Sequence, residues 1–173
     1  MDLKSHIRHV PDFPKPGILF YDIGTLLAHG PAWGETIDSL AACVREDKPD
    51  VLMGIESRGF LVAAPLAAAL GLGIVMIRKK GKLPGKTVSY SYDLEYGSAT
   101  LEMHVEDIKP KSRFLIVDDL IATGGTINAT CDMIRMGGAE PVRAFSVVGL
   151  PFLNYRETVS NLPIDTLIEY FGE

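Results

Sequence analysis

The stretch from Phe114 to Thr126 reads FLIVDDLIATGGT and decides the fold class of this chain. It begins with four apolar residues in a row, the pattern of a short strand that is covered on both faces in a parallel sheet. Asp118 and Asp119 follow, and we expect this polar pair to end the strand. The small residues after them form a glycine-rich turn that leads into a helical stretch. This order of strand, acidic pair, turn and helix is typical of an α/β domain.

The glycine-rich turn has the chemistry of a phosphate site. It consists of Ala122, Thr123, Gly124, Gly125 and Thr126. Backbone N–H groups at the start of a helix lack partners within the helix, and the helix dipole is positive there, so a phosphate monoester fits. The two carboxylates before the turn can accept hydrogen bonds from the vicinal hydroxyls of a ribose, or hold waters around a divalent metal. The motif therefore predicts a site for a phosphorylated sugar.

An ordinary turn after a solvated strand end is the alternative interpretation of this motif. Such a turn needs only one glycine and one capping residue, whereas this stretch combines adjacent glycines, threonines and an acidic pair. The motif also lacks the Gly-Lys-Ser/Thr ending of a P-loop and the G-x-G-x-x-G spacing of a dinucleotide fold. We therefore favour the sugar-phosphate site.

Strands and helices alternate through most of the chain. The expected strands are 51–55, 74–77, 113–117 and 142–148, and the expected helices are about 33–44, 60–70 and 126–136. This alternation implies right-handed crossovers and a mostly parallel central sheet flanked by helices. A chain of 173 residues is enough for one such domain, and we expect residues 1–173 to form a single unit.

A second loop of the same kind follows the expected strand 51–55. It reads Glu56-Ser57-Arg58-Gly59 and opens a helix. Because the carboxyl ends of parallel strands share one edge of the sheet, we expect both loops to face one crevice. Ser57, Arg58 and the backbone amides could then hold a pyrophosphate. A surface arginine that pairs with a neighbouring carboxylate is the weaker alternative.

The alternation stops between Arg78 and Val105, where we expect a long flexible loop with a hairpin-like pair of strands acting as a lid. Its segment GKLPGKT is not a P-loop, because three residues separate the glycines where the motif requires four. We interpret its basic residues as a mobile cationic flap that closes on a polyanion, although a solvated charge run is the usual explanation. These residues are Arg78, Lys79, Lys80, Lys82 and Lys86.

An apolar and aromatic segment from Phe13 to Tyr21 precedes the alternating elements. It could be an arm that covers the core, or it could supply one wall of a slot for a flat heteroaromatic base. Composition favours neither interpretation. The four histidines show no metal-ligand spacing, and we assign them no chemistry.

The composition restricts the class of partner. Seventeen Lys and Arg residues against 22 Asp and Glu give a net charge of −5, which argues against a nucleic-acid or membrane-surface role. Cys43 and Cys131 lie in amphipathic stretches without metal-ligand partners, so we expect two buried thiols. The N-terminal MDLKSHIRHV lacks the apolar core of a signal peptide, and no run reaches transmembrane length. We therefore expect a soluble, cytoplasmic protein.

Five segments together resemble the adenine-specific branch of the type I phosphoribosyltransferase family. They are DFPKPGILFYDI, GIESRGF, RKKGKLPG, YDLEYG and FLIVDDLIATGGT, in the family's order and over nearly the whole chain. The last is shared by the whole family, whereas RKKGKLPG and LEYG are narrower and select the branch. The resemblance implies the type I phosphoribosyltransferase fold and transfer of the phosphoribosyl group of phosphoribosyl diphosphate (PRPP) to adenine, giving AMP and pyrophosphate. It also implies a magnesium-dependent, cytoplasmic homodimer.

The resemblance further implies roles for residues that bind the donor. Asp118 and Asp119 would bind the ribose hydroxyls, and residues 122–126 would hold the 5′-phosphate. Arg58, next to Ser57, would bind pyrophosphate. Magnesium would be held mainly through PRPP and water rather than by protein ligands.

The flexible loop would carry further catalytic groups. Lys79 and Lys82 would help to hold the leaving pyrophosphate, so that Lys82 joins Arg58 as a catalytic residue. Glu95 matches the family's proposed acid/base residue, and Tyr96 follows it in the LEYG segment.

Leu19 and Phe20 would line the adenine pocket, and Tyr21 follows them directly. Many family members carry an arginine where this chain has Tyr21. If that arginine acts through backbone contacts or by closing the segment, tyrosine can replace it. If its charge matters, adenine affinity should fall.

Two rival functions remain. The donor site would serve equally for hypoxanthine, guanine or xanthine, although LEYG and KLPG disfavour these acceptors. A non-catalytic regulator that senses PRPP is the other rival, but regulators of that kind carry an added DNA-binding segment and a basic surface.

Overall fold

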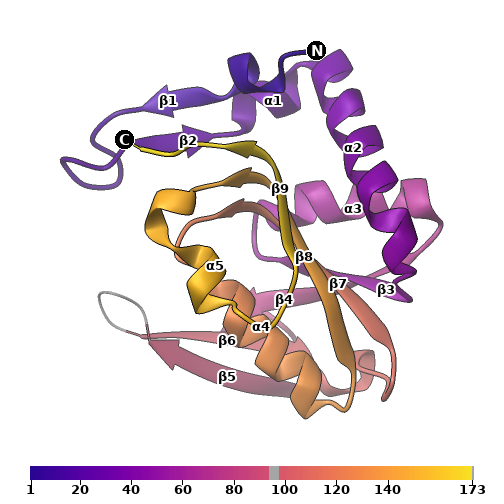
Figure 1. Cartoon of the computed structure of the whole chain (residues 1–173). Coiled ribbons are helices and arrows are strands. Elements are labelled where there is room, and N and C mark those ends of the chain that lie inside the picture. Colours follow the sequence, from indigo (N-terminus) through magenta and orange to yellow (C-terminus); the bar gives the residue numbers. More distant parts are fainter. Residues whose placement is uncertain (94–97, 173) are drawn as a thin grey trace.

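The computed structural model describes residues 1–93 and 98–172, and within them a seven-stranded sheet forms the centre of the molecule (Figure 1). Its strand order is β5-β6-β4-β3-β7-β8-β9. The strands are β3 Val51–Ile55, β4 Gly73–Lys79, β5 Thr87–Asp93, β6 Ser98–His104, β7 Arg113–Ile121, β8 Glu140–Gly149 and β9 Ile164–Glu169. The neighbours from β4 to β9 are parallel, and the β5/β6 hairpin joins the edge of β4 in antiparallel register.

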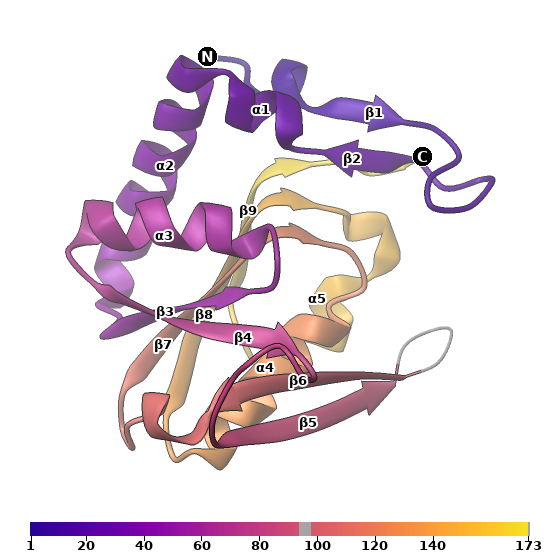
Figure 2. The same ribbon diagram turned by 180° about the vertical axis from the view of Figure 1, so that it is seen from behind.

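Helices cover both faces of this sheet. The longer ones are α2 Gly30–Val44, α3 Gly59–Leu70 and α4 Gly125–Met136, and the short ones are α1 Gly24–Ala28 and α5 Tyr155–Thr158. Single 3₁₀ turns occur at Leu3–His6, Arg45–Asp47, Val105–Asp107 and Pro151–Leu153. Helices α2 and α3 lie on one face, and α4 and α5 lie on the other (Figure 2). None of the helices in the described ranges is long and apolar enough to cross a membrane.

Alternation along the strands builds a separate apolar core on each face. On β7, Leu115 and Val117 face the core under α2 and α3, whereas Phe114 and Ile116 face the core under α4. All four side chains are fully buried. Because every second residue of a strand points to the same side, a strand covered by helices on both faces must be apolar throughout. The expectation of a buried parallel strand at this position is confirmed.

The expectation that Asp118 and Asp119 end this strand is wrong. Strand β7 continues to Ile121, and Asp118 lies opposite Ser146 while Leu120 lies opposite Val148. The reason is the partner strand, because β8 extends to Gly149 and supplies backbone hydrogen bonds beyond the apolar run. The polarity of the side chains does not limit this pairing, since they project from the sheet rather than into the ladder.

Two further features escaped the sequence. An N-terminal hairpin, formed by β1 Arg8–Val10 and β2 Phe20–Asp22, lies beside the C-terminal end of the chain (Figure 1). Cys131 is buried as expected, but Cys43 is exposed, which contradicts the expectation of two buried thiols. On α2 the buried stripe contains Ile37, Leu40 and Val44, and successive residues turn by about 100°, so position 43 falls outside it.

Candidate functional site

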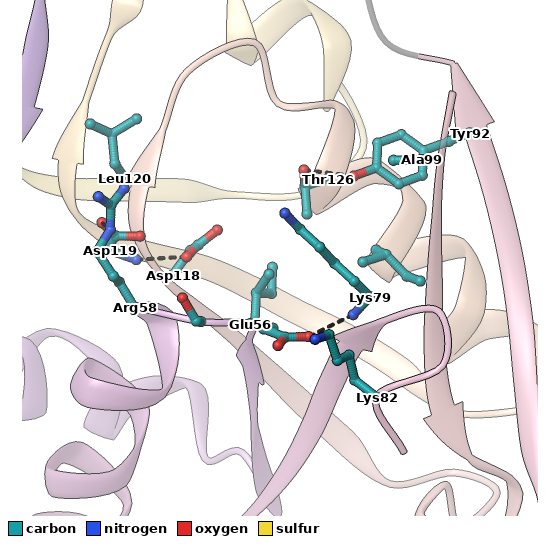
Figure 3. Close-up of a pocket in the computed structure, with 13 residues that line it drawn as sticks. Glu56, Arg58, Lys79, Lys82, Tyr92, Ala99, Asp118, Asp119, Leu120 and Thr126 are labelled. Atoms are coloured by element: carbon teal, nitrogen blue, oxygen red, sulfur yellow. Dashed lines mark hydrogen bonds and ion pairs between the residues drawn. The ribbon is translucent and has the colours of Figure 1, made fainter. Parts of the chain in front are cut away.

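The two predicted loops meet at one edge of the sheet. Strand β3 leads through α3 to β4 on one side, whereas β7 leads through α4 to β8 on the other. The crevice between the carboxyl ends of β3 and β7 is therefore the point where the strand order reverses, which is where open α/β sheets bind ligands. A cavity of about 640 Å³ opens there (Figure 3). Its lining comprises Ile55, Glu56, Ser57, Arg58, Lys79, Lys82, Tyr92, Ala99, Leu101, Asp118, Asp119, Leu120 and Thr126.

The glycine-rich turn lines a smaller cavity of about 110 Å³ beside the first. All five of its residues, from Ala122 to Thr126, contribute to this wall, and Asp118, Leu120 and Thr126 line both cavities. Gly124 precedes α4 with a φ of 84°, and no side chain caps the helix. Because the first N–H groups of a helix have no partner inside it, this uncapped end offers several donors to an anion.

Asp118 and Asp119 bring two carboxyl groups into the cavity. Asp119 is 5% exposed, and Asp118 is half-buried. Burial raises the pKa of Asp118 well above its ordinary value, and the charge of Asp119 raises this pKa further. Burial also raises the pKa of Asp119, against the opposing effect of Arg58. Hydroxyl groups of a ligand would therefore stabilise these two carboxylates, because burial limits their contact with water.

Replacing Asp118 by Asn is expected to raise the melting temperature at neutral pH. The folded protein holds a proton on Asp118 more tightly than the unfolded chain does, so the ionised carboxylate costs stability above the raised pKa. That cost vanishes as the pH falls below the ordinary value of 3.8. Asparagine keeps the oxygen that accepts the Asp119 N–H at 2.8 Å. Thermal unfolding measured between neutral pH and a pH below 3.8 tests this effect. A variant that melts at the wild-type temperature at neutral pH would contradict it. Asp38→Asn, on the exposed face of α2, is the matched control and should change nothing.

Arg58 connects the two loops. Its Nε lies 2.6 Å from Asp119 Oδ2, which lacks any other partner among the described residues. The same guanidinium lies over the Phe20 ring, with Cζ 5.0 Å from the ring centroid. Through these two contacts, Arg58 joins the loop after β3 to the acidic pair on β7 and to the N-terminal hairpin.

The lysine-bearing turn after β4 is held by side chains. Glu56 accepts hydrogen bonds from Arg78 Nη2 at 2.9 Å and from the Lys79 N–H at 2.8 Å. Although burial alone would raise the pKa of Glu56, the hydrogen bond from Arg78 holds it below the ordinary value. Arg78 Nη1 donates to the Lys82 carbonyl at 2.8 Å, and buried Glu102 accepts the Gly81 N–H at 2.8 Å. These contacts present Lys79 and Lys82 to the cavity, where Figure 3 shows Lys79 reaching toward Thr126. Lys80 and Lys86, which the sequence grouped with them, do not line it.

The N-terminal segment reaches the site through one residue of the three that the sequence singled out. Phe20 is half-buried and contacts Arg58, while its ring meets that of Phe13 edge-on at 5.1 Å. Leu19 is partly buried against the core under α2 and lines a separate shallow pocket. Tyr21 is 1% exposed and points into the core, so it lies away from the cavity.

Sequence reasoning assigned no role to Tyr92 or Glu56, and it placed Arg78 on the cationic flap without its pairing to Glu56. The Tyr92 hydroxyl lies 3.0 Å from Thr126 Oγ1 and links the β5/β6 hairpin to the glycine-rich turn. Its alternation with Tyr90 along β5 was the available signal, since both half-buried rings face α4. Glu95 and Tyr96 lie outside the described residues, and their roles stay predictions.

The carboxylates of the site could bind a metal ion that is also coordinated by a phosphate-containing ligand. Within residues 1–93 and 98–172, no group of three or more His, Cys, Asp or Glu side chains is placed to hold a metal ion. Mg²⁺ commonly binds through one or two carboxylates, with phosphate and water oxygens completing its shell. Asp118 and Asp119 supply such carboxylates beside the glycine-rich turn, so they fit an ion of this kind.

Comparisons with known proteins agree with this geometry. The model of the phosphoribosyl transferase domain family matches residues 25–157. The chain is 56% identical over 170 residues to an adenine phosphoribosyltransferase of Rhodospirillum centenum, covering 98% of this chain and 99% of that one. A homologue of the same name from Rhodospirillum rubrum is 57% identical with the same coverage.

Solved structures give the same result for the fold. The adenine phosphoribosyltransferase of Thermoanaerobacter pseudethanolicus superposes with a TM-score of 0.95 at 42% identity, covering 98% of each chain. The enzyme of that name from Saccharomyces cerevisiae, crystallised with adenine and an imino-altritol bisphosphate, has a TM-score of 0.91 at 38% identity over 96% of each chain.

Proposed function

The chain belongs to the adenine phosphoribosyltransferases, a branch of the phosphoribosyl transferase domain family, and from this premise we propose that it transfers the phosphoribosyl group of PRPP to adenine. The products are AMP and pyrophosphate. The observation that carries the proposal is the single cavity of about 640 Å³, which joins the Arg58 loop, the acidic pair and the edge of the glycine-rich turn. The yeast relative, solved with adenine, supports the choice of base. We take residues 1–173 as one catalytic domain.

The donor occupies the two anion loops and the carboxylates between them. Residues 122–126 hold the 5′-phosphate at the start of α4. Asp118 and Asp119 accept hydrogen bonds from the ribose hydroxyls. These bonds stand in for the contacts with water that the two carboxylates lose through burial, the loss that raises their pKa values. Ser57 and Arg58 bind the diphosphate on the far side of the cavity. The donor then lies with its anomeric carbon between the two loops.

Positive groups around the diphosphate drive bond cleavage. Breaking the bond from the anomeric carbon to the diphosphate builds positive charge on the ribose and negative charge on the leaving group. Arg58, Lys79 and Lys82 stabilise the leaving group. The backbone of the turn that bears the two lysines is held in place before the substrate arrives. The lysine side chains then close over the bound diphosphate and exclude water that would otherwise hydrolyse the donor. Asp118 and Asp119 would help to hold a magnesium ion that arrives with PRPP, and such an ion would neutralise part of the charge of the diphosphate.

The base enters beside Phe20, and Leu19 contributes to the same segment. An aromatic ring that already lies against a guanidinium offers a flat apolar wall next to the reacting centre. Glu95 serves as the acid or base at the purine nitrogen, and Tyr96 lies next to it in the sequence. Among the acceptors, adenine is favoured over hypoxanthine, guanine and xanthine. A PRPP-sensing regulator is the less favoured second candidate.

Lys82→Ala is expected to lower turnover about tenfold while leaving the fold intact, because it removes one of the charges that stabilise the departing diphosphate. The exposed position of Lys82 limits the effect through solvent screening. Steady-state rates at saturating adenine and PRPP measure the change. Lys86→Ala removes the same charge from outside the cavity and should behave as the wild type. Unchanged kinetics in Lys82→Ala would remove this turn from the mechanism.

We also propose that the protein is a cytoplasmic homodimer. Helix α3 carries no charged residue along GFLVAAPLAAAL, and its Leu61 is 50% exposed. On the neighbouring strand β4, Ile74 and Met76 are 37% and 43% exposed. A second copy of the chain would cover these apolar side chains. The free thiol of exposed Cys43 is compatible with a reducing compartment.

Met76→Glu is expected to shift the protein from dimer to monomer, since it places a charge in the apolar face that the second copy covers. Sedimentation velocity at micromolar concentration measures the shift. Met136→Glu, at a side chain on α4 that is 65% exposed, is the matched control and should remain dimeric. A Met76→Glu protein that stays dimeric would place the interface elsewhere.

The proposed activity is tested with a panel of purine bases, each incubated with PRPP and magnesium. Pyrophosphate release should depend on adenine and be at least tenfold slower with hypoxanthine, guanine or xanthine. Release with one of those bases but not with adenine would support the alternative acceptor. Release with none of them, together with tight PRPP binding, would support the regulator.

A further inference from the structure

An aromatic cluster joins the N-terminal hairpin to the C-terminal end of the chain. The rings of Tyr21 and Tyr170 stack with centroids 4.0 Å apart and an angle of 26° between their planes. His9 meets both rings edge-on, at 5.1 and 5.3 Å, and its Nε2 lies 3.2 Å from the Tyr170 hydroxyl. The Tyr21 hydroxyl donates to the Gly172 carbonyl at 3.2 Å. His9 and Tyr21 are also register partners between β1 and β2, so both strands of the hairpin take part.

The C-terminal segment that receives the hairpin is itself fixed to the central sheet. Tyr170 N–H donates to the Gly149 carbonyl at the end of β8, at 3.1 Å. Lys4 adds a contact from the N-terminal side, with Nζ 3.0 Å from the Glu169 carbonyl and 4.3 Å from the Tyr170 ring centroid. The cluster therefore attaches the hairpin to the central sheet through the C-terminal segment.

Tyr21 and Phe20 point to opposite sides of β2. Tyr21 is 1% exposed in the core, whereas Phe20 lies against Arg58 at the edge of the cavity. Because neighbouring residues of a strand project to opposite faces, a shift or rotation of the hairpin that loosens Tyr21 also moves Phe20. The stack of Tyr21 on Tyr170 thus affects the distance between the Phe20 ring and the Arg58 guanidinium.

We propose that Tyr21 is a positioning residue for the acceptor base, which acts through the Tyr21–Tyr170 stack to hold Phe20 over Arg58. The inference rests on the proposed function, because it takes Phe20 as a wall of the adenine site. The stack is neutral and buried, so it holds the hairpin without a charge at position 21. If the hairpin is in place in only a fraction of the molecules, the apparent affinity for the base is the intrinsic affinity multiplied by that fraction. The donor loops belong to β3, β7 and α4, and Arg58 keeps its ion pair with Asp119 when Phe20 moves, so the affinity for PRPP should change little.

Tyr21→Leu tests the proposal by removing the stack. The KM for adenine should rise about tenfold, in keeping with the loss of one buried aromatic pair, while the KM for PRPP stays within about twofold of the wild type. Tyr21→Phe keeps the ring and loses the hydrogen bond from the hydroxyl to Gly172, so it should restore most of the adenine affinity. Tyr170→Leu breaks the same stack from the other side, and its effect should not add to that of Tyr21→Leu.

Leu40→Ala is the control for general loss of stability. Leu40 is fully buried in the same core as Tyr21 but lies on α2, away from the hairpin. It should lower the melting temperature while leaving the KM for adenine unchanged. Equal rises of both KM values in Tyr21→Leu, or a rise in Leu40→Ala as large as in Tyr21→Leu, would reduce Tyr21 to ordinary core packing and overturn the proposal. A wild-type protein that does not use adenine would instead refute the proposed function, which separates the two failures.

Discussion

Arg58→Gln is expected to lower kcat/KM for PRPP about a thousandfold. The glutamine keeps much of the length of arginine but removes the positive charge that faces the departing diphosphate, and a single well-placed donor in such a site is worth about a hundredfold to a thousandfold. The substitution also leaves the buried Asp119 carboxylate without its counter-ion, whose Nε lies 2.6 Å away. Steady-state kinetics with each substrate varied in turn measure the loss.

The pH dependence of the same variant provides a second readout. Burial raises the pKa of Asp119, and Arg58 opposes this rise, so its removal should raise the pKa of the Asp118–Asp119 pair further. Donor affinity, which requires ionised carboxylates, should then decline at a higher pH in Arg58→Gln than in the wild type as the pH is lowered. Arg135→Gln is the control, because its exposed pair with Asp132 on α4, at 3.6 Å, lies outside the cavity. Wild-type kinetics in Arg58→Gln would exclude Arg58 from the reaction.

Gly59→Ala is expected to damage both the fold and the donor site. A Cβ at this position would lie 2.9 Å from Asp118 Oδ1 and 3.0 Å from the Val117 carbonyl oxygen. The carbonyl belongs to the central strand β7 and cannot retreat, so α3 must shift away or Asp118 must turn out of place. We expect a loss of about 2 kcal/mol in the free energy of unfolding, typical of overpacking, and at least a tenfold rise in the KM for PRPP.

Chemical denaturation and PRPP kinetics measure these two effects of Gly59→Ala. The control is Gly30→Ala at the start of α2, where an added Cβ meets no atom within 4 Å. That variant should be as stable as the wild type or slightly more stable, since alanine is the better helix former. If Gly59→Ala keeps the wild-type stability and donor affinity, the close approach of α3 to Asp118 has no functional weight.

Local pattern was sufficient to predict most of the central sheet and the meeting of the two glycine-containing loops at one cavity. The strand at 51–55 and the helix at 60–70 are confirmed to within one residue, because an apolar run and a flanking glycine define each of them. The end of β7 was not predictable in this way. Its length is set by pairing with β8, and the pairing partner of a strand cannot be identified from the strand's own residues.

The contacts that organise the site depend on residues far apart in the sequence. Tyr21 looked like part of the base pocket because it follows Phe20, but its ring stacks on Tyr170 near the other end of the chain. The cationic cluster from Arg78 to Lys86 resembled a uniformly mobile flap. In the fold Arg78 pairs with Glu56 and two of the lysines line the cavity, because Glu56 and Glu102 hold the backbone of the turn. A charge pattern alone does not distinguish these roles.

The most direct test of phosphoribosyl transfer is the stoichiometry of the products. Purified protein is incubated with adenine, PRPP and magnesium, and AMP and pyrophosphate are quantified over time by chromatography. We predict that both products appear in equal amounts as adenine disappears, and that neither forms when adenine is omitted. The absence of AMP, or pyrophosphate release accompanied by ribose 5-phosphate in place of AMP, would contradict the assignment of this cavity to transfer onto adenine.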